Sequence, residues 1–361
     1  MKRYGYLYPK ITSFENLVLA AKCAQKSKRF RPEVLRFNLN FETEILQLQT
    51  ELQTQTYQPG SYFNFEIYDP KPRWISAAPY RDRVVHHALC NVIQPIFERS
   101  FIADTYANRI GYGTHRALRR FAHFTRKSSH VFQADIRRYF PNINHSILKT
   151  LIRRKIKCPG TLGLIDRIID NSPILPSSPP SRTGSASRAQ PPQEIPSSPD
   201  STGIPIGNLT SQFFANLYLS GFDHYVLEHL KPQGYIRYVD DFALFSNDRD
   251  ELYSNRQSIE TYLKTQLHLE IHPIKSQIFE TRIGCNFVGF RVFPDRIRVR
   301  NSQLRHSRLR IKRWKDLDRQ NALSVETIQR TLTSWNAHLS HANTYKLRQT
   351  IEAKLPQHWL S

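Results

Sequence analysis

Three aspartates stand where this sequence otherwise favours apolar β-strands. Asp240 and Asp241 are adjacent and lie between two β-forming segments, and Asp135 lies near the end of a third such segment, residues 130–136. Adjacent carboxylates repel each other, and hairpin turns usually carry Asn-Gly or Asp-Gly instead. A solvated acidic turn is the simplest interpretation of the adjacent pair alone. The third acid, on another strand, favours a functional site.

The chemistry that suits such a group of acids is metal-assisted phosphoryl transfer. Mg²⁺ prefers oxygen ligands, so a bound cation would relieve the repulsion. Three carboxylates on neighbouring strands could hold two Mg²⁺ ions roughly 4 Å apart, the arrangement for in-line displacement at phosphorus. One ion would activate a primer 3′-hydroxyl, and the other would neutralise a triphosphate and its leaving pyrophosphate. The sequence therefore predicts Asp135, Asp240 and Asp241 as catalytic and metal-binding residues.

The segments that must position these acids predict a mixed α and β protein. Residues 235–245 predict a strand, a two-residue turn and a strand, with both acids at the tip. Residues 287–299 predict a second hairpin that turns at Pro294-Asp295. Helical periodicity predicts helices at residues 41–52, 82–97 and 208–230, the second capped by Asp82, and a strongly basic helical region from Asn301 onward.

The charge balance of the 361-residue chain indicates a polyanionic partner. Lysine and arginine number 52 against 30 aspartates and glutamates, a formal net charge of +22. Such an excess is typical of proteins that bind nucleic acid or an anionic membrane surface. Hydrophobic residues make up 39% and aromatic residues 12% of the chain, which excludes a wholly disordered basic tail.

The location expected from the sequence is the cytoplasm. No apolar run reaches the roughly 18 residues that a membrane-spanning helix needs, and the N-terminal residues lack a secretory signal. The cysteines have no CxxC spacing, which argues against a zinc site or a disulfide framework and for a reducing compartment. They are Cys23, Cys90, Cys158 and Cys285.

Residues 172–203 differ in composition from the rest of the chain. They hold eight of the 22 prolines and many serines. Such a segment buries too little apolar surface to offset the entropy lost on ordering. The sequence predicts a flexible insertion in a loop, which a globular unit tolerates because loop-closure entropy grows slowly with length.

Several segments resemble the motifs of reverse transcriptases, in the same order along the chain. Tyr238-Val239-Asp240-Asp241 resembles their YxDD box, a weak match by itself. It becomes specific because residues 135–140 (DIRRYF), about a hundred residues earlier, resemble their first palm motif. Further resemblances extend the match from about residue 81 to 290, at residues 81–89 (RDRVVHHAL), 106–118 (YANRIGYGTHRAL) and 287–290 (FVGF).

The resemblance implies an α+β fold in the form of a right-hand polymerase. This fold has fingers, a palm with an antiparallel sheet and flanking helices, and a helical thumb. We expect an N-terminal extension and fingers at residues 1–125, a palm with fingers elements and the insertion at 126–290, and a basic thumb at 291–361. The implied activity is RNA-directed DNA polymerisation from dNTP substrates, with two Mg²⁺ ions held by the three aspartates and the Ile136 carbonyl.

The same resemblance implies roles for residues around the acids. Phe140 would screen the sugar and clash with a 2′-hydroxyl, although core packing is the alternative. Arg109 would pair with the triphosphate through its guanidinium, and a solvated surface arginine is the alternative. Lys275 would neutralise or protonate the leaving pyrophosphate. Phe287 and Gly289 fall in the hairpin that grips the primer.

The block before the YxDD box narrows the resemblance. Most reverse transcriptases carry Gln-Gly-x-x-x-Ser-Pro there, whereas this chain has Ile206, Gly207 and, at the last position, Gln212. This departure, with a softer match at residues 334–348, resembles the enzymes of diversity-generating retroelements, which copy a template RNA with errors at adenines. Isoleucine offers shape without a polar contact, and a loss of roughly 1–3 kcal/mol would blunt nucleotide discrimination. Alternatively, Ile206 only packs and Gln212 only caps a helix or faces solvent.

A basic run toward the C-terminus is expected to hold nucleic acid. The resemblance implies a template RNA and an RNA/cDNA duplex as partners, with the small basic accessory variability protein of such retroelements, a helical oligomer, in a bacterial cytoplasm. The arginines expected to follow the phosphates are Arg296, Arg298, Arg300, Arg305, Arg308 and Arg313.

Two other interpretations stay open. The first is another bacterial reverse transcriptase, group II intron-like or CRISPR-associated, which the Ile-Gly-x-x-x-Ser-Gln box disfavours. The second is a non-catalytic RNA-binding remnant of the fold. The three intact acids disfavour it, because a remnant has no need of carboxylates that repel each other.

Overall fold

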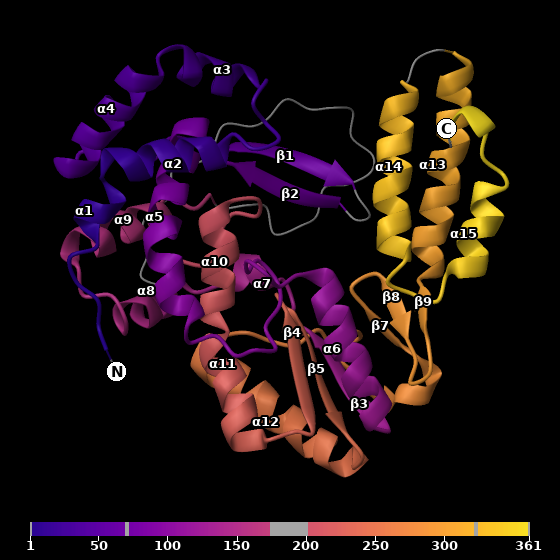
Figure 1. Cartoon of the computed structure of the whole chain (residues 1–361). Coiled ribbons are helices and arrows are strands. Elements are labelled where there is room, and N and C mark those ends of the chain that lie inside the picture. The colour runs from indigo at the N-terminus through magenta and orange to yellow at the C-terminus, as the bar shows by residue number, and fades with distance from the viewer. Residues whose placement is uncertain (1, 69–71, 174–200, 321–323, 360–361) are drawn as a thin grey trace.

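A four-stranded antiparallel sheet carries the three aspartates in the computed structural model of the chain (Figure 1). The structure describes residues 2–68, 72–173, 201–320 and 324–359. The strand order is β4-β5-β3-β6, and the strands are β3 (His130–Asp135), β4 (Gly234–Tyr238), β5 (Asp241–Ser246) and β6 (Gln277–Glu280). The predicted strand at residues 130–136 and the predicted hairpin at residues 235–245 are therefore confirmed.

Helices cover both faces of this sheet because side chains alternate along each strand. Phe132 and Phe242 point to one face, where Phe242 packs edge-on against Phe222 with ring centroids 5.2 Å apart. Phe245 points to the other face and meets the ring of Phe121 at 5.0 Å. The covering helices are α10 (Leu209–Tyr218), α11 (Ser220–Tyr225) and α12 (Arg249–Leu267) on the first face and α6 (Thr114–Lys127) on the second.

The N-terminal part of the chain is mainly helical, with one antiparallel hairpin (Figure 1). The longest helix of this N-terminal part, α5, packs against α2 and against α10, so it connects the N-terminal helices to the helices that cover the sheet. The elements are α1 (Tyr8–Ile11), α2 (Phe14–Ala24), α3 (Pro32–Leu39), α4 (Phe41–Gln53), β1 (Phe63–Tyr68), β2 (Pro72–Ala77) and α5 (Tyr80–Glu98).

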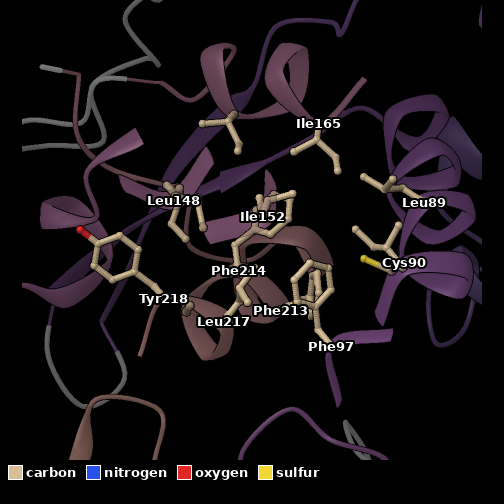
Figure 2. Close-up of a cluster of buried hydrophobic side chains, with 14 of the residues drawn as sticks. Leu89, Cys90, Phe97, Leu148, Ile152, Ile165, Phe213, Phe214, Leu217 and Tyr218 are labelled. Carbon is tan, nitrogen blue, oxygen red and sulfur yellow. The ribbon is translucent and has the colours of Figure 1, made fainter. Parts of the chain in front are cut away.

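One apolar core runs through this junction. Figure 2 shows Phe97 of α5 beside Phe213 of α10, and their ring centroids are 5.6 Å apart. Leu148 and Ile165 reach the same core from two further helices. Leu148 lies on α8 (His145–Arg153) and Ile165 on α9 (Pro159–Asp170), and both helices follow the short helix α7 (Tyr139–Asn142) in the segment between β3 and β4.

Asp82 does not cap the α5 helix, so that expectation is wrong. The helix begins at Tyr80 after Pro79, and Asp82 is buried inside its first turn. Its carboxylate accepts hydrogen bonds from the Tyr57 hydroxyl at 2.7 Å and the Gly60 N–H at 2.8 Å. Burial raises the pKa of Asp82 although both bonds oppose this. The two hydrogen bonds to the Asp82 carboxylate therefore link the loop before β1 to α5.

The C-terminal part consists of a small sheet and a group of three helices (Figure 1). The β8–β9 connection contains Pro294-Asp295, as predicted, and a second tight turn at Val288-Gly289 joins β7 to β8. The elements are β7 (Cys285–Phe287), β8 (Phe290–Val292), β9 (Ile297–Val299), α13 (Asn301–Arg319), α14 (Val325–Leu339) and α15 (Tyr345–Glu352). Short helical turns complete the described chain at η1 (Val226–Leu230), η2 (Thr281–Ile283) and η3 (Gln357–Trp359).

The expectations about membrane-spanning helices and about the cysteines can be compared with the described residues. Across these ranges, no helix has the length and apolar content that crossing a membrane requires. All four cysteines are free, and three of them are buried. Most of the predicted insertion, residues 174–200, lies outside the described residues.

Shortening residues 174–200 to a Gly-Ser linker of about ten residues should leave folding and activity intact, because closure entropy changes little with loop length. The chain after this segment has its own anchors: the Ser201 carbonyl accepts from the His145 N–H at 3.0 Å, and the Gly203 N–H donates to the Ile143 carbonyl at 2.9 Å. Thermal unfolding and primer extension measure the outcome. Loss of extension in a variant that unfolds at the original temperature would contradict the prediction.

Candidate active site

Strand pairing brings the three aspartates to one end of the central sheet. Asp135 ends β3 and lies directly opposite Asp241, the first residue of β5. Asp240 belongs to the two-residue turn between β4 and β5, and its carbonyl accepts a hydrogen bond from the Ile136 N–H at 3.3 Å. The sequence predicted both acids at the hairpin tip, whereas Asp241 already forms part of the strand.

The turn that carries Asp240 has an unusual main-chain conformation. Val239, its first residue, has a φ of 60°. This left-handed region suits Gly or Asn, and a β-branched residue there is an outlier that costs on the order of 1–3 kcal/mol. The surrounding structure must hold this conformation, and such strain is common at functional sites.

Crowding of the carboxylates raises two pKa values. The surrounding protein withdraws Asp240 from water, and the charge of Asp135 adds to this, so the pKa of Asp240 rises to about 6. Asp241 is exposed at this end of the sheet, but desolvation by the protein around it, followed by the charges of Asp240 and Asp135, raises its pKa to about 7. Both acids therefore attract a proton or a cation more strongly than an ordinary aspartate does.

Basic side chains partly offset this negative charge. Lys275 forms an ion pair with Asp135, and its charge lowers the pKa values of Asp240 and Asp241. Arg73, on β2, lowers the pKa of Asp240, and Arg300 lowers that of Asp241. Lys275 was predicted to belong to the site, but Arg73 was missed. Arg73 could have been noticed in the sequence as a positively charged residue within a segment that is otherwise rich in aromatic residues.

The donor set fits Mg²⁺ in chemistry, since three carboxylates and a main-chain carbonyl are hard oxygen ligands. The side chains are not arranged as a complete metal site: within the described residues, no three acidic, histidine or cysteine side chains are close enough together to bind one metal ion. Asp135 is instead paired with Lys275. Ile136 is buried and bridges to Ile271, and its N–H bond to the Asp240 carbonyl places its main chain beside the acids.

A buried ion pair lies directly behind the acidic turn. Arg237 of β4 and Asp223 of α11 have no exposed side-chain surface, and Arg237 Nε and Nη2 donate to the two Asp223 carboxylate oxygens at 2.7 and 2.6 Å. Arg237 Nη1 donates to the Val239 carbonyl at 2.8 Å. This pair was not predicted from the sequence. A charged residue inside an apolar strand was the available signal, because a buried charge needs a partner.

Three of the residues predicted to bind nucleotide meet in one loop region. Phe140 is half-buried, and its carbonyl accepts from the Ile204 N–H at 3.0 Å. The Ile206 carbonyl accepts from the Ser76 N–H of β2 at 3.2 Å, so this loop joins α7 to the strand that carries Arg73. Gly207 has a φ of 117°, and a Cβ there would stand 3.2 Å from Ile75 Cγ2, which explains the glycine.

Gln212 and Arg109 stand apart from that loop region. Gln212 is half-buried in the first turn of α10, where its N–H donates to the Asn208 carbonyl at 3.2 Å. Arg109 faces its own loop: Nη1 donates to the carbonyls of Ile102 and Thr105, each at 2.8 Å, and the guanidinium lies 3.9 Å from the Tyr112 ring centroid. The structure gives Arg109 a role in shaping this loop, and its pairing with a triphosphate stays a prediction.

The hairpin predicted to grip a primer contacts the acidic hairpin. Phe287 stacks on Phe121 at 4.3 Å and meets the ring of Tyr238 edge-on at 6.4 Å. Gly289 has a φ of 91°, and a Cβ there would lie 2.5 Å from Gln303 Nε2 of α13. The positive φ is what favours glycine in this turn, because the Gln303 side chain is flexible and could move away from a Cβ.

The arginines predicted to follow phosphates lie on the surface. All six are exposed, and none of the α13 residues is buried. Arg296 and Arg298 flank the Phe293 ring at 4.6 and 5.8 Å, and Arg296 also pairs with Asp295. The exposed set is Arg296, Arg298, Arg300, Arg305, Arg308 and Arg313.

Replacing Asp240 with asparagine should stabilise the metal-free protein near neutral pH. A carboxyl whose folded-state pKa is raised adds stability that is full below its ordinary pKa of 3.8 and is lost as pH rises through about 6. Asparagine carries no charge to be desolvated. D240N should therefore raise the free energy of unfolding by about 1–3 kcal/mol at about pH 8 and change it little at about pH 4.

Urea denaturation at both pH values measures this effect. Asp316→Asn, at an exposed acid on α13, is the matched control and should show no such gain. Mg²⁺ added to the unsubstituted protein should raise its unfolding temperature more at the higher pH, because protons compete with the ion for the same oxygens. Equal stability of D240N and the original chain at the higher pH would contradict the desolvation and charge repulsion assigned to Asp240.

Comparisons with known proteins agree with the geometry of the acids. Residues 68–292 match the family model described as reverse transcriptase (RNA-dependent DNA polymerase), a span that includes all three aspartates, Arg73, Ile206 and Lys275. Protein YkfC of Escherichia coli (strain K12) is 24% identical over 306 residues, which cover 73% of this chain and 74% of that protein. The chain belongs to the reverse transcriptase family and is an RNA-directed DNA polymerase.

Proposed function

We propose that this reverse transcriptase copies the template RNA of a diversity-generating retroelement into error-prone cDNA, using Asp135, Asp240 and Asp241 as its metal-binding catalytic residues. One observation carries the catalytic assignment: β3 and β5 pair so that Asp135 faces Asp241 beside the turn that holds Asp240. Two Mg²⁺ ions would supply the charge that activates a primer 3′-hydroxyl and neutralises the triphosphate.

The chain's own residues prepare the site for this chemistry. Lys275 pairs with Asp135 and balances its charge. If Asp135 held a metal ion instead, Lys275 would be available to neutralise the pyrophosphate. The charge of Arg73 also acts on Asp240, so Arg73 is a second candidate for binding triphosphate oxygens. The Ile136 carbonyl would complete the oxygen ligands.

The fold supports an assignment of fingers, palm and thumb. The central sheet with α10, α11 and α12 corresponds to a palm, the N-terminal helices with the β1–β2 hairpin to fingers, and the α13–α15 group to a thumb. The expected boundary between residues 290 and 291 falls within β8, so the three-stranded sheet connects palm and thumb as one unit.

The Ile206 region supports the retroelement assignment. Ile206 is half-buried beside β2, on the loop that also bonds to Phe140. An isoleucine at this place offers an incoming nucleotide shape without a hydrogen bond, which would weaken discrimination. The Ile-Gly-x-x-x-Ser-Gln box disfavours a group II intron-like or CRISPR-associated enzyme, and three carboxylates gathered at one sheet end disfavour a non-catalytic remnant.

The surface supports the proposed partners. Six exposed arginines follow one another from the β8–β9 turn along α13, a positive track for template RNA and RNA/cDNA duplex. The accessory variability protein is proposed from the retroelement assignment alone.

Replacing Asp240 with alanine should abolish primer extension, with a loss of at least about 100-fold, because the metal ions lose a ligand. Extension of a labelled primer on an RNA template, with Mg²⁺ and dNTPs, measures the rate. Asp250→Ala, at an exposed acid on α12, is the matched control and should keep the original rate. Unchanged extension by D240A would refute the catalytic assignment.

Replacing Ile206 with glutamine should lower the error frequency at template adenines several-fold, because the amide restores a polar contact of roughly 1–3 kcal/mol. Sequencing of cDNA made on a template of mixed composition measures errors at each base. Leu39→Gln, at an 83% exposed leucine of α3, is the control and should leave the error pattern unchanged. If the original enzyme makes no more errors at adenines than at other bases, the retroelement assignment is wrong.

A further inference from the structure

We propose that the buried Arg237–Asp223 pair is a positioning device that holds the Val239-Asp240 turn in the conformation that places Asp240 beside Asp135. The inference rests on the proposed catalytic role of Asp240. Arg237 acts through the main-chain carbonyl of Val239, with which it shares a hydrogen bond, and is therefore a positioning residue.

The turn cannot hold this geometry by its own residues. Two-residue hairpin turns with a positive φ at the first position normally place Gly, Asn or Asp there. This chain has valine, with a φ of 60°, so the preferred conformation of the free residue differs from the one observed. Contacts with the surrounding residues must therefore stabilise the positive φ of Val239.

Arg237 is placed to do so because its guanidinium is planar and its donors point in fixed directions. Nε and Nη2 are taken by the two oxygens of Asp223, at 2.7 and 2.6 Å. With those two bonds made, Nη1 is aimed at the Val239 carbonyl at 2.8 Å and also reaches Asn216 Oδ1 at 3.3 Å. A lysine ammonium could not meet the same set of acceptors.

Asp223 is itself fixed by two further donors. The Tyr235 hydroxyl donates to Oδ1 at 2.7 Å, and the Thr105 hydroxyl donates to Oδ2 at 3.0 Å. The main chain of Arg237 is bonded to the neighbouring loop at both groups: its N–H donates to the Asp104 carbonyl at 2.9 Å, and its carbonyl accepts from the Tyr106 N–H at 3.1 Å. The pair thus has little freedom to move.

The turn is consequently held at two successive carbonyls. Arg237 binds that of Val239 from the buried side, and the Ile136 N–H binds that of Asp240 from β3 at 3.3 Å. The second bond links the turn to the strand that carries Asp135. Loss of the first would let Asp240 shift relative to Asp135, and a misplacement of about 1 Å costs on the order of 100-fold in rate.

A purely structural role is the rival explanation, and it makes different predictions. A buried ion pair can often be replaced by apolar residues without loss of stability. The double substitution Arg237→Met with Asp223→Leu removes both charges together and leaves no buried charge unpaired. If the pair serves folding alone, such a variant that folds normally should also polymerise normally.

We expect the double variant to unfold within a few degrees of the original protein but to extend primers about 30- to 100-fold more slowly. Half-saturation by Mg²⁺ should move to several-fold higher concentration. Binding of Mn²⁺ to the protein without nucleic acid, followed by electron paramagnetic resonance, should weaken in parallel. Arg153→Met with Asp166→Leu, which removes an ion pair between α8 and α9 that is not part of this network, is the control and should match the original enzyme in all three measurements.

A rescue experiment separates turn geometry from general damage. Glycine adopts a positive φ without strain. Adding Val239→Gly to the double variant should therefore recover about tenfold of the lost rate and part of the Mn²⁺ affinity. If the double variant does not fold, Arg237→Lys, which keeps a charge opposite Asp223, is measured in the same way with the same expected losses and rescue.

Two results would overturn the proposal. The first is a folded variant without the guanidinium that keeps the original rate, Mg²⁺ dependence and Mn²⁺ affinity. The second is a loss of rate that Val239→Gly does not reduce while Mn²⁺ binding stays unchanged. Neither result depends on the catalytic assignment itself, because D240A tests that separately: an inactive D240A beside a fully active Arg237 variant would refute this inference alone.

Discussion

Repulsion among carboxylates is the interaction on which the rest of this structure depends. Three aspartates meet at one end of a sheet, and two of them titrate well above the ordinary range because of desolvation and of each other. Such a group persists only if rigid strands hold it and cations compensate it. The β3–β5 register supplies the first condition, and Lys275 with neighbouring arginines supplies the second.

The net charge of +22 acquires a more definite meaning from this arrangement. A few cations, among them Lys275, Arg73 and Arg300, act on the acids directly. The larger share lies on the outside, for example along α13, where no side chain is buried. Arg237 belongs to neither group, because it is fully buried and Asp223 neutralises its charge. The net charge therefore includes three kinds of cation: those that act on the acids, those exposed on the surface, and the buried Arg237.

Patterns of the local sequence predicted elements well and contacts poorly. The helix at residues 41–52, the strand ending at Asp135 and both hairpins appear as expected, because periodicity and turn residues are local properties. Asp82 resembled a cap because it precedes an apolar helical run, yet Tyr57 and Gly60 bind it inside the helix. Arg109 likewise faces two carbonyls of its own loop. Partners of this kind come from the three-dimensional packing.

The sequence by itself determined the acids, their order along the chain and the family they indicate, because these depend on residue type and spacing. Only the tertiary structure decided that Asp241 opposes Asp135, that Arg73 reaches the same site and that Arg237 supports the turn from behind. The physical reason is that antiparallel register and tertiary packing join residues more than a hundred positions apart, and no local pattern encodes which donor meets which acceptor. Val239 shows this best, since its own preference opposes the conformation that the fold imposes on it.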